Sequence, residues 1–167
     1  MSENDRRVRR TRSMLHRALM ELMVERGYER VTVQDILDRA DVGRSTFYAH
    51  FRSKDDLLVV SGAEYLRSVI AEHAGDPVRM LFDLVDGYPE MFGTLVGRKS
   101  SAVVIRGAQQ MVADVLSDSG MTEPHGTFVS WGLVGLLAAV VEGRITADEG
   151  YSVVSSSAGV RAAGTPS

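Results

Sequence analysis

The chain has 167 residues, with 19 Lys+Arg against 22 Asp+Glu, four His and no Cys. The absence of cysteine excludes a disulfide framework, thiolate metal sites and a cysteine nucleophile. With 44% hydrophobic residues the chain can bury a core, and its length allows one compact domain or two small modules. Taken alone, the net charge of -3 argues against a nucleic-acid-binding protein.

The charges are unevenly distributed along the chain. Residues 1–60 carry 12 Lys+Arg and 10 Asp+Glu, whereas residues 61–167 carry 7 and 12. The first arginines crowd toward the start of the chain, as Arg6, Arg7, Arg9, Arg10, Arg12 and Arg17. Such a run is compatible with a solvated terminal tail and equally with an arm attracted to nucleic-acid phosphates.

Residues 11–26 form the first predicted helix. Its apolar residues recur with the spacing of one helical face, as Met14, Leu15, Ala18, Leu19, Leu22 and Met23. Gly27 follows and can end the helix in the left-handed conformation. Thr32 and Asp35 then resemble a capping box, which predicts that a second helix begins directly after Thr32.

Two short helices are predicted over residues 33–40 and 44–51, joined by the turn Asp41-Val42-Gly43. Phe47 and Phe51 lie four residues apart, so we expect both on the buried face of the second helix. Two short helices joined by a turn that contains glycine are typical of a helix-turn-helix, whose second helix enters the DNA major groove.

The rest of the chain is also predicted to be helical, and the expected fold is all-α. The helices are placed at residues 54–72, 77–96, 101–117, 125–142 and 147–162. Pro77 suits the first turn of its helix, and Thr146 with Glu149 forms a capping box for the last one.

No signal peptide is apparent, and the longest apolar run, FVSWGLVGLLAAVV, covers only residues 128–141. A spanning helix needs roughly 20 apolar residues, so we expect no membrane contact and a cytoplasmic protein. The run is better explained as a helix buried in a core or a subunit interface.

Residues 11–58, TRSMLHRALMELMVERGYERVTVQDILDRADVGRSTFYAHFRSKDDLL, resemble the DNA-binding domain of the TetR family of transcriptional regulators. The resemblance implies an all-α homodimer with two modules. Residues 1–53 would be a helix-turn-helix DNA-binding domain with a basic N-terminal arm, and residues 54–167 a helical effector-binding and dimerisation domain. The implied function is that of a repressor released from a palindromic operator on double-stranded DNA by a small-molecule inducer. Control by a protein partner, or constitutive action, remains the alternative.

The resemblance also implies which residues contact DNA. Base edges and phosphates would meet Arg44, Ser45 and Thr46, the DNA backbone would meet Tyr48, His50 and Lys54, and the flanking strand would meet Thr32 and Gln34. An arginine can bind guanine through two hydrogen bonds, worth ~1–3 kcal/mol of discrimination. Tyr48 could instead be partly buried against the first helix, and His50 could cap a helix end. Asp41 stands where the family usually has Gly, but Asp tolerates left-handed backbone, so we expect the turn to be retained.

Apolar residues of the C-terminal part could line a ligand cavity. The candidates are Phe82, Met91, Phe92, Met111 and Trp131, with Trp131 preferred, although residues at such spacing are commonly core. No cofactor and no metal site are expected, because the histidines lack a third ligand. No nucleophile–base pair, Gly-rich phosphate loop or HExxH motif is present, so the chain is not expected to be an enzyme.

The apolar run is also the predicted dimer interface. Small residues would let a partner helix approach closely while larger ones fill the contact, and the last helix would complete a four-helix bundle across a two-fold axis. The expected interface residues are Gly132, Leu133, Leu136, Leu137 and Val140, with Val153 and Val154 from the last helix. The alternative is a core helix within one chain.

Overall fold

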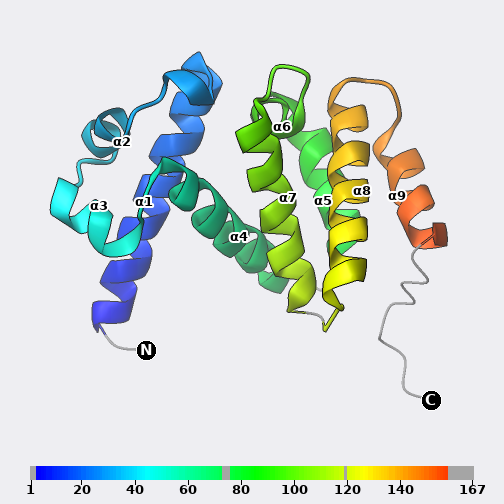
Figure 1. Cartoon of the computed structure of the whole chain (residues 1–167), viewed down its shortest axis with the longest axis horizontal. Helices are drawn as coiled ribbons and strands as arrows, with labels where there is room; N and C mark the ends of the chain where they lie inside the picture. The colour runs from blue at the N-terminus through cyan, green and yellow to red at the C-terminus, as the bar shows by residue number, and fades with distance from the viewer. Residues whose placement is uncertain (1–2, 73–75, 119, 158–167) are drawn as a thin grey trace.

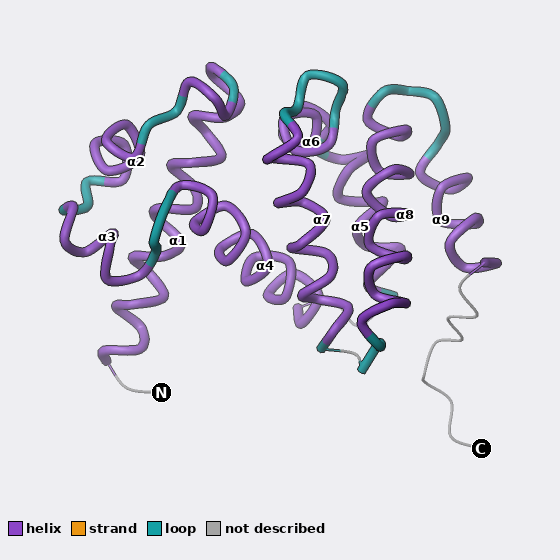
Figure 2. The backbone as a smooth tube through the Cα atoms, in the orientation of Figure 1, coloured by secondary structure: helices purple, strands orange, loops and turns teal. Residues whose placement is uncertain are grey.

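The computed structural model describes residues 3–72, 76–118 and 120–157. Within these ranges all regular elements are helices, which confirms the predicted all-α fold (Figures 1 and 2). They are α1 (Glu3–Arg26), the 3-10 helix η1 (Tyr28–Arg30), α2 (Val33–Ala40), α3 (Arg44–His50), α4 (Lys54–Glu72), α5 (Pro77–Gly87), α6 (Pro89–Val96), α7 (Ala102–Ser117), α8 (Glu123–Val141) and α9 (Ala147–Ser157). Val160 and the predicted end of the last helix at Ala162 lie outside the described residues.

Helices α1, α2 and α3 gather at one end of the molecule (Figure 1). α1 begins at Glu3, so the arginine-rich segment belongs to the first helix rather than preceding it. Arginine is a good helix former, and an acidic residue such as Asp5 near the N-terminus is favoured by the helix dipole. The prediction that this helix begins near Thr11 was therefore wrong.

The turn between α2 and α3 has the expected conformation. Asp41 adopts φ 52° and ψ 50°, in the left-handed region, and its N–H donates to the Leu37 carbonyl. The expectation that aspartate is accommodated at this position is confirmed. The capping box of α2 is also present, because the Asp35 N–H donates to Thr32 Oγ1 at 3.2 Å and the Thr32 N–H donates to Asp35 Oδ2 at 2.8 Å.

A fully buried apolar cluster holds the three N-terminal helices together. Phe47 and Phe51 are 0% and 1% exposed, which confirms that both are buried, although Phe51 directly follows α3 in extended backbone and is not part of the helix. They pack in one core with Leu15 and Leu19 of α1 and Ile36 of α2. The position of α3 is therefore fixed by burial, while its polar residues are left on the outer faces.

The predicted single helix over residues 77–96 is wrong, because the chain breaks at Tyr88. Pro89 has no N–H to donate and disfavours helical backbone in the residue before it. Tyr88 accordingly has φ −133° and ψ 55°, and α5 and α6 are separate helices. The break lets α6 pack against α1, α7 and α8.

Helix α4 connects the two ends of the molecule, and α8 is the central helix of the C-terminal bundle (Figure 1). α4 packs on α1 and α7, whereas α8 packs on α5, α6, α7 and α9. Among the described residues, Glu123–Val141 is the one helix long and apolar enough to cross a membrane by length and composition. The helix begins before the apolar run at residue 128 and is therefore longer than the run. Our expectation that this segment is too short to cross a membrane thus does not hold on length alone. Its packing against four helices accounts for part of this apolar character.

Candidate functional site

The polar residues of α3 are accessible at the surface. Arg44, Ser45 and Thr46 form its exposed first turn. Tyr48 is 52% exposed and meets the Phe47 ring edge-to-face, so most of its ring is open to contact. His50 is half-buried at the end of the helix. The side chains predicted to meet DNA from this helix thus lie together on an exposed surface.

Arg44 is positioned by a hydrogen bond to the preceding helix. Its Nη2 donates to Gln34 Oε1 at 2.8 Å, and Gln34 Nε2 donates to Asp38 Oδ1 at 2.7 Å. Both Arg44 and Gln34 are exposed, so this contact is worth little in water. A base edge with two acceptors can replace it, because the guanidinium offers donors in a fixed fork.

Thr32 and Lys54 already have partners within the protein. The Thr32 hydroxyl takes part in the α2 capping box, and its bonds together with Arg26 lower the pKa of Asp35 to about 2. Lys54 Nζ donates to the carbonyls of Tyr28 and Val31 at 2.9 and 2.8 Å, and lies 4.0 Å from the centre of the Tyr28 ring. Lys54 thus ties the start of α4 to η1, and its predicted phosphate contact would use the remaining N–H.

Some charged side chains around the helix-turn-helix are held in ion pairs and others are not. Glu21 and Glu25 are both bound by Arg39, whose hydrogen bond lowers the pKa of Glu25. By contrast, four arginines of α1 have no ion-pair partner among the described residues: Arg6, Arg7, Arg10 and Arg17. Several acidic groups of this module are therefore neutralised while cationic side chains stay open.

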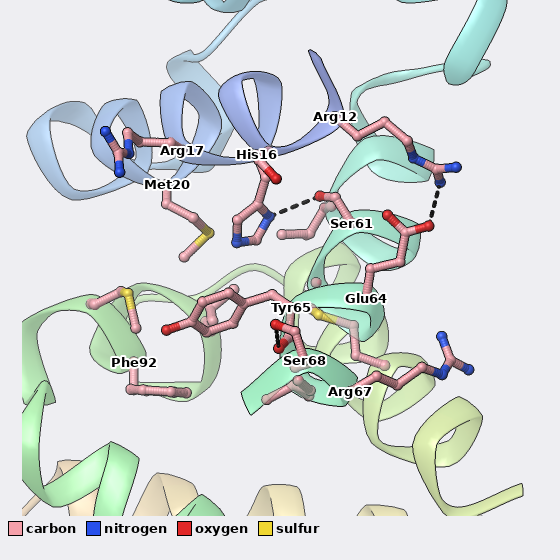
Figure 3. A pocket seen from close by; sticks show the side chains of 18 of the residues that line it. Arg12, His16, Arg17, Met20, Ser61, Glu64, Tyr65, Arg67, Ser68 and Phe92 are labelled. Carbon is pink, nitrogen blue, oxygen red and sulfur yellow. Dashed lines mark hydrogen bonds and ion pairs between the residues drawn. The ribbon is translucent and has the colours of Figure 1, made fainter. Parts of the chain in front are cut away.

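A cavity of about 1520 Å³ lies where α1 meets α4, α6 and α7 (Figure 3). Of the ligand candidates, Met91, Phe92 and Met111 line it. Phe82 does not, because it is fully buried against Gly150. Trp131 does not either, since it lies 44% exposed on α8. These two candidates therefore lie outside the lining of this cavity.

The sequence analysis missed the polar side of this cavity. His16, Met20, Ser61 and Tyr65 from α1 and α4 face it, because α1 borders the C-terminal module as well as the helix-turn-helix. The available signal was His16 itself, a polar residue at the edge of the apolar face of α1. Its role could not be assigned without the packing of α4.

The predicted dimer residues divide into two groups. Leu133, Leu137 and Val154 are 1%, 4% and 8% exposed and belong to the core of their own chain, as the alternative explanation held. Leu136 and Val140 are half-buried, whereas Gly132 and Val153 are exposed. Two large side chains that we had not assigned to this face are open beside them on α8: Phe128, 76% exposed, and Trp131.

The described residues contain no group of three His, Cys, Asp or Glu placed to hold a metal ion. His125 instead forms a 3.0 Å contact between its Nδ1 and Thr122 Oγ1, at the start of α8. His125 thus contacts the residue that precedes α8.

Comparisons with known proteins agree with this geometry. Residues 15–60 match the family model of bacterial regulatory proteins, tetR family. The HTH-type transcriptional regulator TcmR of Streptomyces glaucescens is 42% identical over 52 residues, which are 31% of this chain and 23% of TcmR. The uncharacterized HTH-type transcriptional regulator YxbF of Bacillus subtilis strain 168 is 40% identical over 55 residues, 32% of this chain and 14% of YxbF. The chain thus matches only a small part of each of these relatives.

The fold as a whole is also found among solved structures. The TetR transcriptional regulator from Streptococcus agalactiae 2603V matches with a TM-score of 0.60 and 19% identity, covering 90% of this chain and 94% of that one. At this identity the likeness establishes the fold. The similar proteins are transcriptional regulators, which are not enzymes.

Proposed function

We propose that this chain, whose N-terminal residues match the tetR family of bacterial regulatory proteins, is a sequence-specific DNA-binding transcriptional regulator of that family. The observation that carries the proposal is the exposed polar surface of α3, which lies within the matched residues 15–60. Such a protein acts on chromosomal DNA, so we place it in the cytoplasm.

In this proposal α3 enters the major groove and α2 braces it across the DNA backbone. Arg44 exchanges its bond with Gln34 for two acceptors on a guanine, while Ser45 and Thr46 meet neighbouring bases or phosphates. Tyr48 and His50 contact the DNA backbone. The unpaired arginines at the start of α1 add sequence-independent attraction to phosphate.

We further propose that the regulator is a homodimer. The open apolar face of α8 and α9, formed by Phe128, Trp131, Gly132, Leu136 and Val153, supports this proposal. Contiguous exposed apolar side chains favour association, and glycine lets a partner helix come close. A two-fold dimer presents two copies of α3, which suits a near-palindromic operator with half-sites ~34–36 Å apart.

The cavity between α1 and α4 favours control by a small ligand over control by a protein partner or constitutive action. A repressor would leave its operator when the ligand stabilises a dimer whose two α3 helices no longer fit successive major grooves. This is a shift between two states, and it needs a ligand that binds one state more tightly.

The test of the DNA-binding proposal is an affinity titration on duplex DNA at several salt concentrations. The parent protein should bind with an affinity that falls steeply with salt, and Arg44→Ala should lose about 1–3 kcal/mol on a preferred sequence while its sequence choice relaxes. Arg98→Ala, an exposed arginine between α6 and α7, is the matched control and should bind as the parent does. Equal binding by Arg44→Ala on preferred and random duplexes, without loss relative to the parent, would contradict the assignment.

A further inference from the structure

The cavity between α1 and the C-terminal helices is apolar in its depth and polar on the side of α1 and α4. Its apolar part is formed by residues such as Met91, Phe92, Met111 and Val134. On the other side His16 projects from α1 toward the Tyr65 ring of α4 (Figure 3). A ligand in this space touches both the module that contains α3 and the C-terminal bundle.

The hydrogen bonds of His16 determine which ring nitrogen carries the proton. The Ser61 hydroxyl donates its single proton to the Leu57 carbonyl, with 2.5 Å between the oxygens. Ser61 Oγ must therefore accept from His16, whose Nδ1 lies 2.8 Å away. Nδ1 thus carries the proton in the neutral ring, and Nε2 is left as an acceptor.

This acceptor has no hydrogen-bond partner among the described residues, and it faces the cavity. In Figure 3, Nε2 points away from Ser61, toward the side where Met20 and Tyr65 lie. The His16 and Tyr65 rings are stacked, with centroids 5.5 Å apart and an interplanar angle of 22°. Burial lowers the pKa of His16 to about 4, so the ring is neutral at pH 7. Its Nε2 can therefore accept a hydrogen bond from a ligand, but the ring carries no positive charge that would attract an anion.

The charged groups nearby do not favour an ionic ligand over a neutral one. The Arg12 guanidinium is paired with Glu64 at 2.8 Å. Arg17 and Glu21 both border the cavity from the exposed side of α1, so charges of both signs lie at its opening. Two polar atoms of the α1 residues that line the cavity lack a hydrogen-bond partner in the described part of the chain: the buried Arg12 Nε, a donor whose guanidinium is already paired with Glu64, and His16 Nε2, an uncharged acceptor.

We propose that this cavity binds an uncharged, largely apolar ligand with a hydroxyl group, and that the hydroxyl donates a hydrogen bond to His16 Nε2. The proposal rests on the proposed function, because it identifies the ligand class of a ligand-responsive regulator. The flexible side chains of Met20, Met91 and Met111 can adapt to ligands of different outline.

Through His16 the ligand also contacts α1, the helix against which the DNA-binding helices pack. His16 directly follows Leu15, which is 0% exposed in the core shared with Phe47 and Phe51. A ligand held between His16 and the C-terminal helices favours one position of α1, and α3 is packed on α1 through that core. The two copies of α3 in a dimer would change their relative placement with it.

The test uses the full-length protein and three naphthalene probes of similar shape. We expect 2-naphthol to bind in a calorimetric titration at pH 7.5. The methyl ether 2-methoxynaphthalene lacks the donor and should bind about 5- to 10-fold more weakly, as should the anion 2-naphthoate. Failure of 2-naphthol to bind, or equal binding of the naphthol and its ether, would overturn the proposal.

Two substitutions at His16 separate the ligand contact from the structural one. Asparagine can keep a donor toward Ser61 but has no group at the Nε2 position, so His16→Asn should bind 2-naphthol about 5- to 10-fold more weakly. His16→Gln reaches the Nε2 position with an amide oxygen and should recover part of the loss. His125→Asn, the same change outside the cavity, should have no effect.

Two readouts keep this proposal distinct from the proposed function. The imidazole ¹⁵N spectrum of the parent should show His16 Nε2 unprotonated, with a signal that moves when 2-naphthol is added, and a protonated Nε2 would overturn the proposal. Binding of the parent to duplex DNA without any probe is measured separately. If the parent does not bind DNA in a salt-dependent way, the proposed regulator function is overturned, while the measured binding of 2-naphthol still stands. If the parent binds DNA but does not prefer 2-naphthol to its ether, only the proposed ligand class is overturned.

Discussion

Asp41 shows how a single residue fixes the geometry of the helix-turn-helix. It is the one non-glycine residue with positive φ in the described part of the chain. A β-branched side chain is strained there, so Asp41→Val should lower the free energy of unfolding by about 1–2 kcal/mol, whereas Asp41→Gly should not lower it. Denaturant unfolding measures both, with Asp38→Val in the helical backbone of α2 as control. A loss for Asp41→Val no larger than that of Asp38→Val would contradict the argument.

Asp35 makes the start of α2 sensitive to acid. Hydrogen bonds from Thr32, together with Arg26, lower its pKa from 3.8 to about 2. Because the pKa is lower in the folded chain, the stabilisation is fully present above about pH 4 and is lost as the pH falls toward 2. Asp35→Asn should therefore be less stable than the parent at pH 6, and the difference should shrink as the solution is acidified. Thermal unfolding from pH 6 to pH 2 measures this, and a constant difference would contradict it.

At the scale of helices, the contact between α5 and α9 depends on a glycine. A Cβ atom at Gly150 would overlap the ring of Phe82, which is fully buried and cannot move aside. Gly150→Ala should consequently lower the free energy of unfolding by about 1–3 kcal/mol. Gly87→Ala, where the added atom meets open space, is the matched control and should be neutral. If the two variants unfold alike, α9 does not pack on Phe82 as described.

The helices could be predicted where a local signal sets their ends. Thr32 with Asp35, and Gly27 after the first apolar face, mark boundaries that the structure has. The break at Pro89 could also have been predicted, because proline disfavours helical backbone in the residue before it, but our prediction ran one helix through this position. The early start of α1 had no apolar signal, because it depends on arginine propensity rather than on burial.

The site was predictable to the extent that it is local. The α3 surface follows from residues 44–50 alone, whereas the cavity joins residues from six helices that lie far apart in sequence. His16 and Ser61 are 45 positions apart, and no periodicity connects them. Trp131 illustrates the opposite error, because its apolar character indicated burial while the packing of α8 leaves it at the surface.

At the scale of the whole molecule, the exposed face of α8 is expected to hold two chains together. Trp131 and Phe128 would be buried in the proposed dimer, and a charge placed among them would lose its hydration. Trp131→Glu should therefore convert the dimer to monomer at micromolar concentration, as measured by sedimentation. Val103→Glu on α7, at similar exposure, is the control and should stay dimeric. A dimeric Trp131→Glu would place the interface elsewhere.

The net charge of -3 conceals a division between two parts of the molecule. The helix-turn-helix end carries unpaired arginines, while the C-terminal helices hold the excess of carboxylates. In a dimer the basic end is present twice, so electrostatic attraction to DNA is compatible with an acidic chain.

Selection of preferred sequences from random duplex DNA with the full-length protein tests the central proposal most directly. The account predicts enrichment of an inverted repeat whose half-sites lie about one helical turn apart, bound by two copies of the chain and lost with Arg44→Ala. Enrichment of no sequence, or of a single half-site bound by one copy and insensitive to Arg44→Ala, would contradict it.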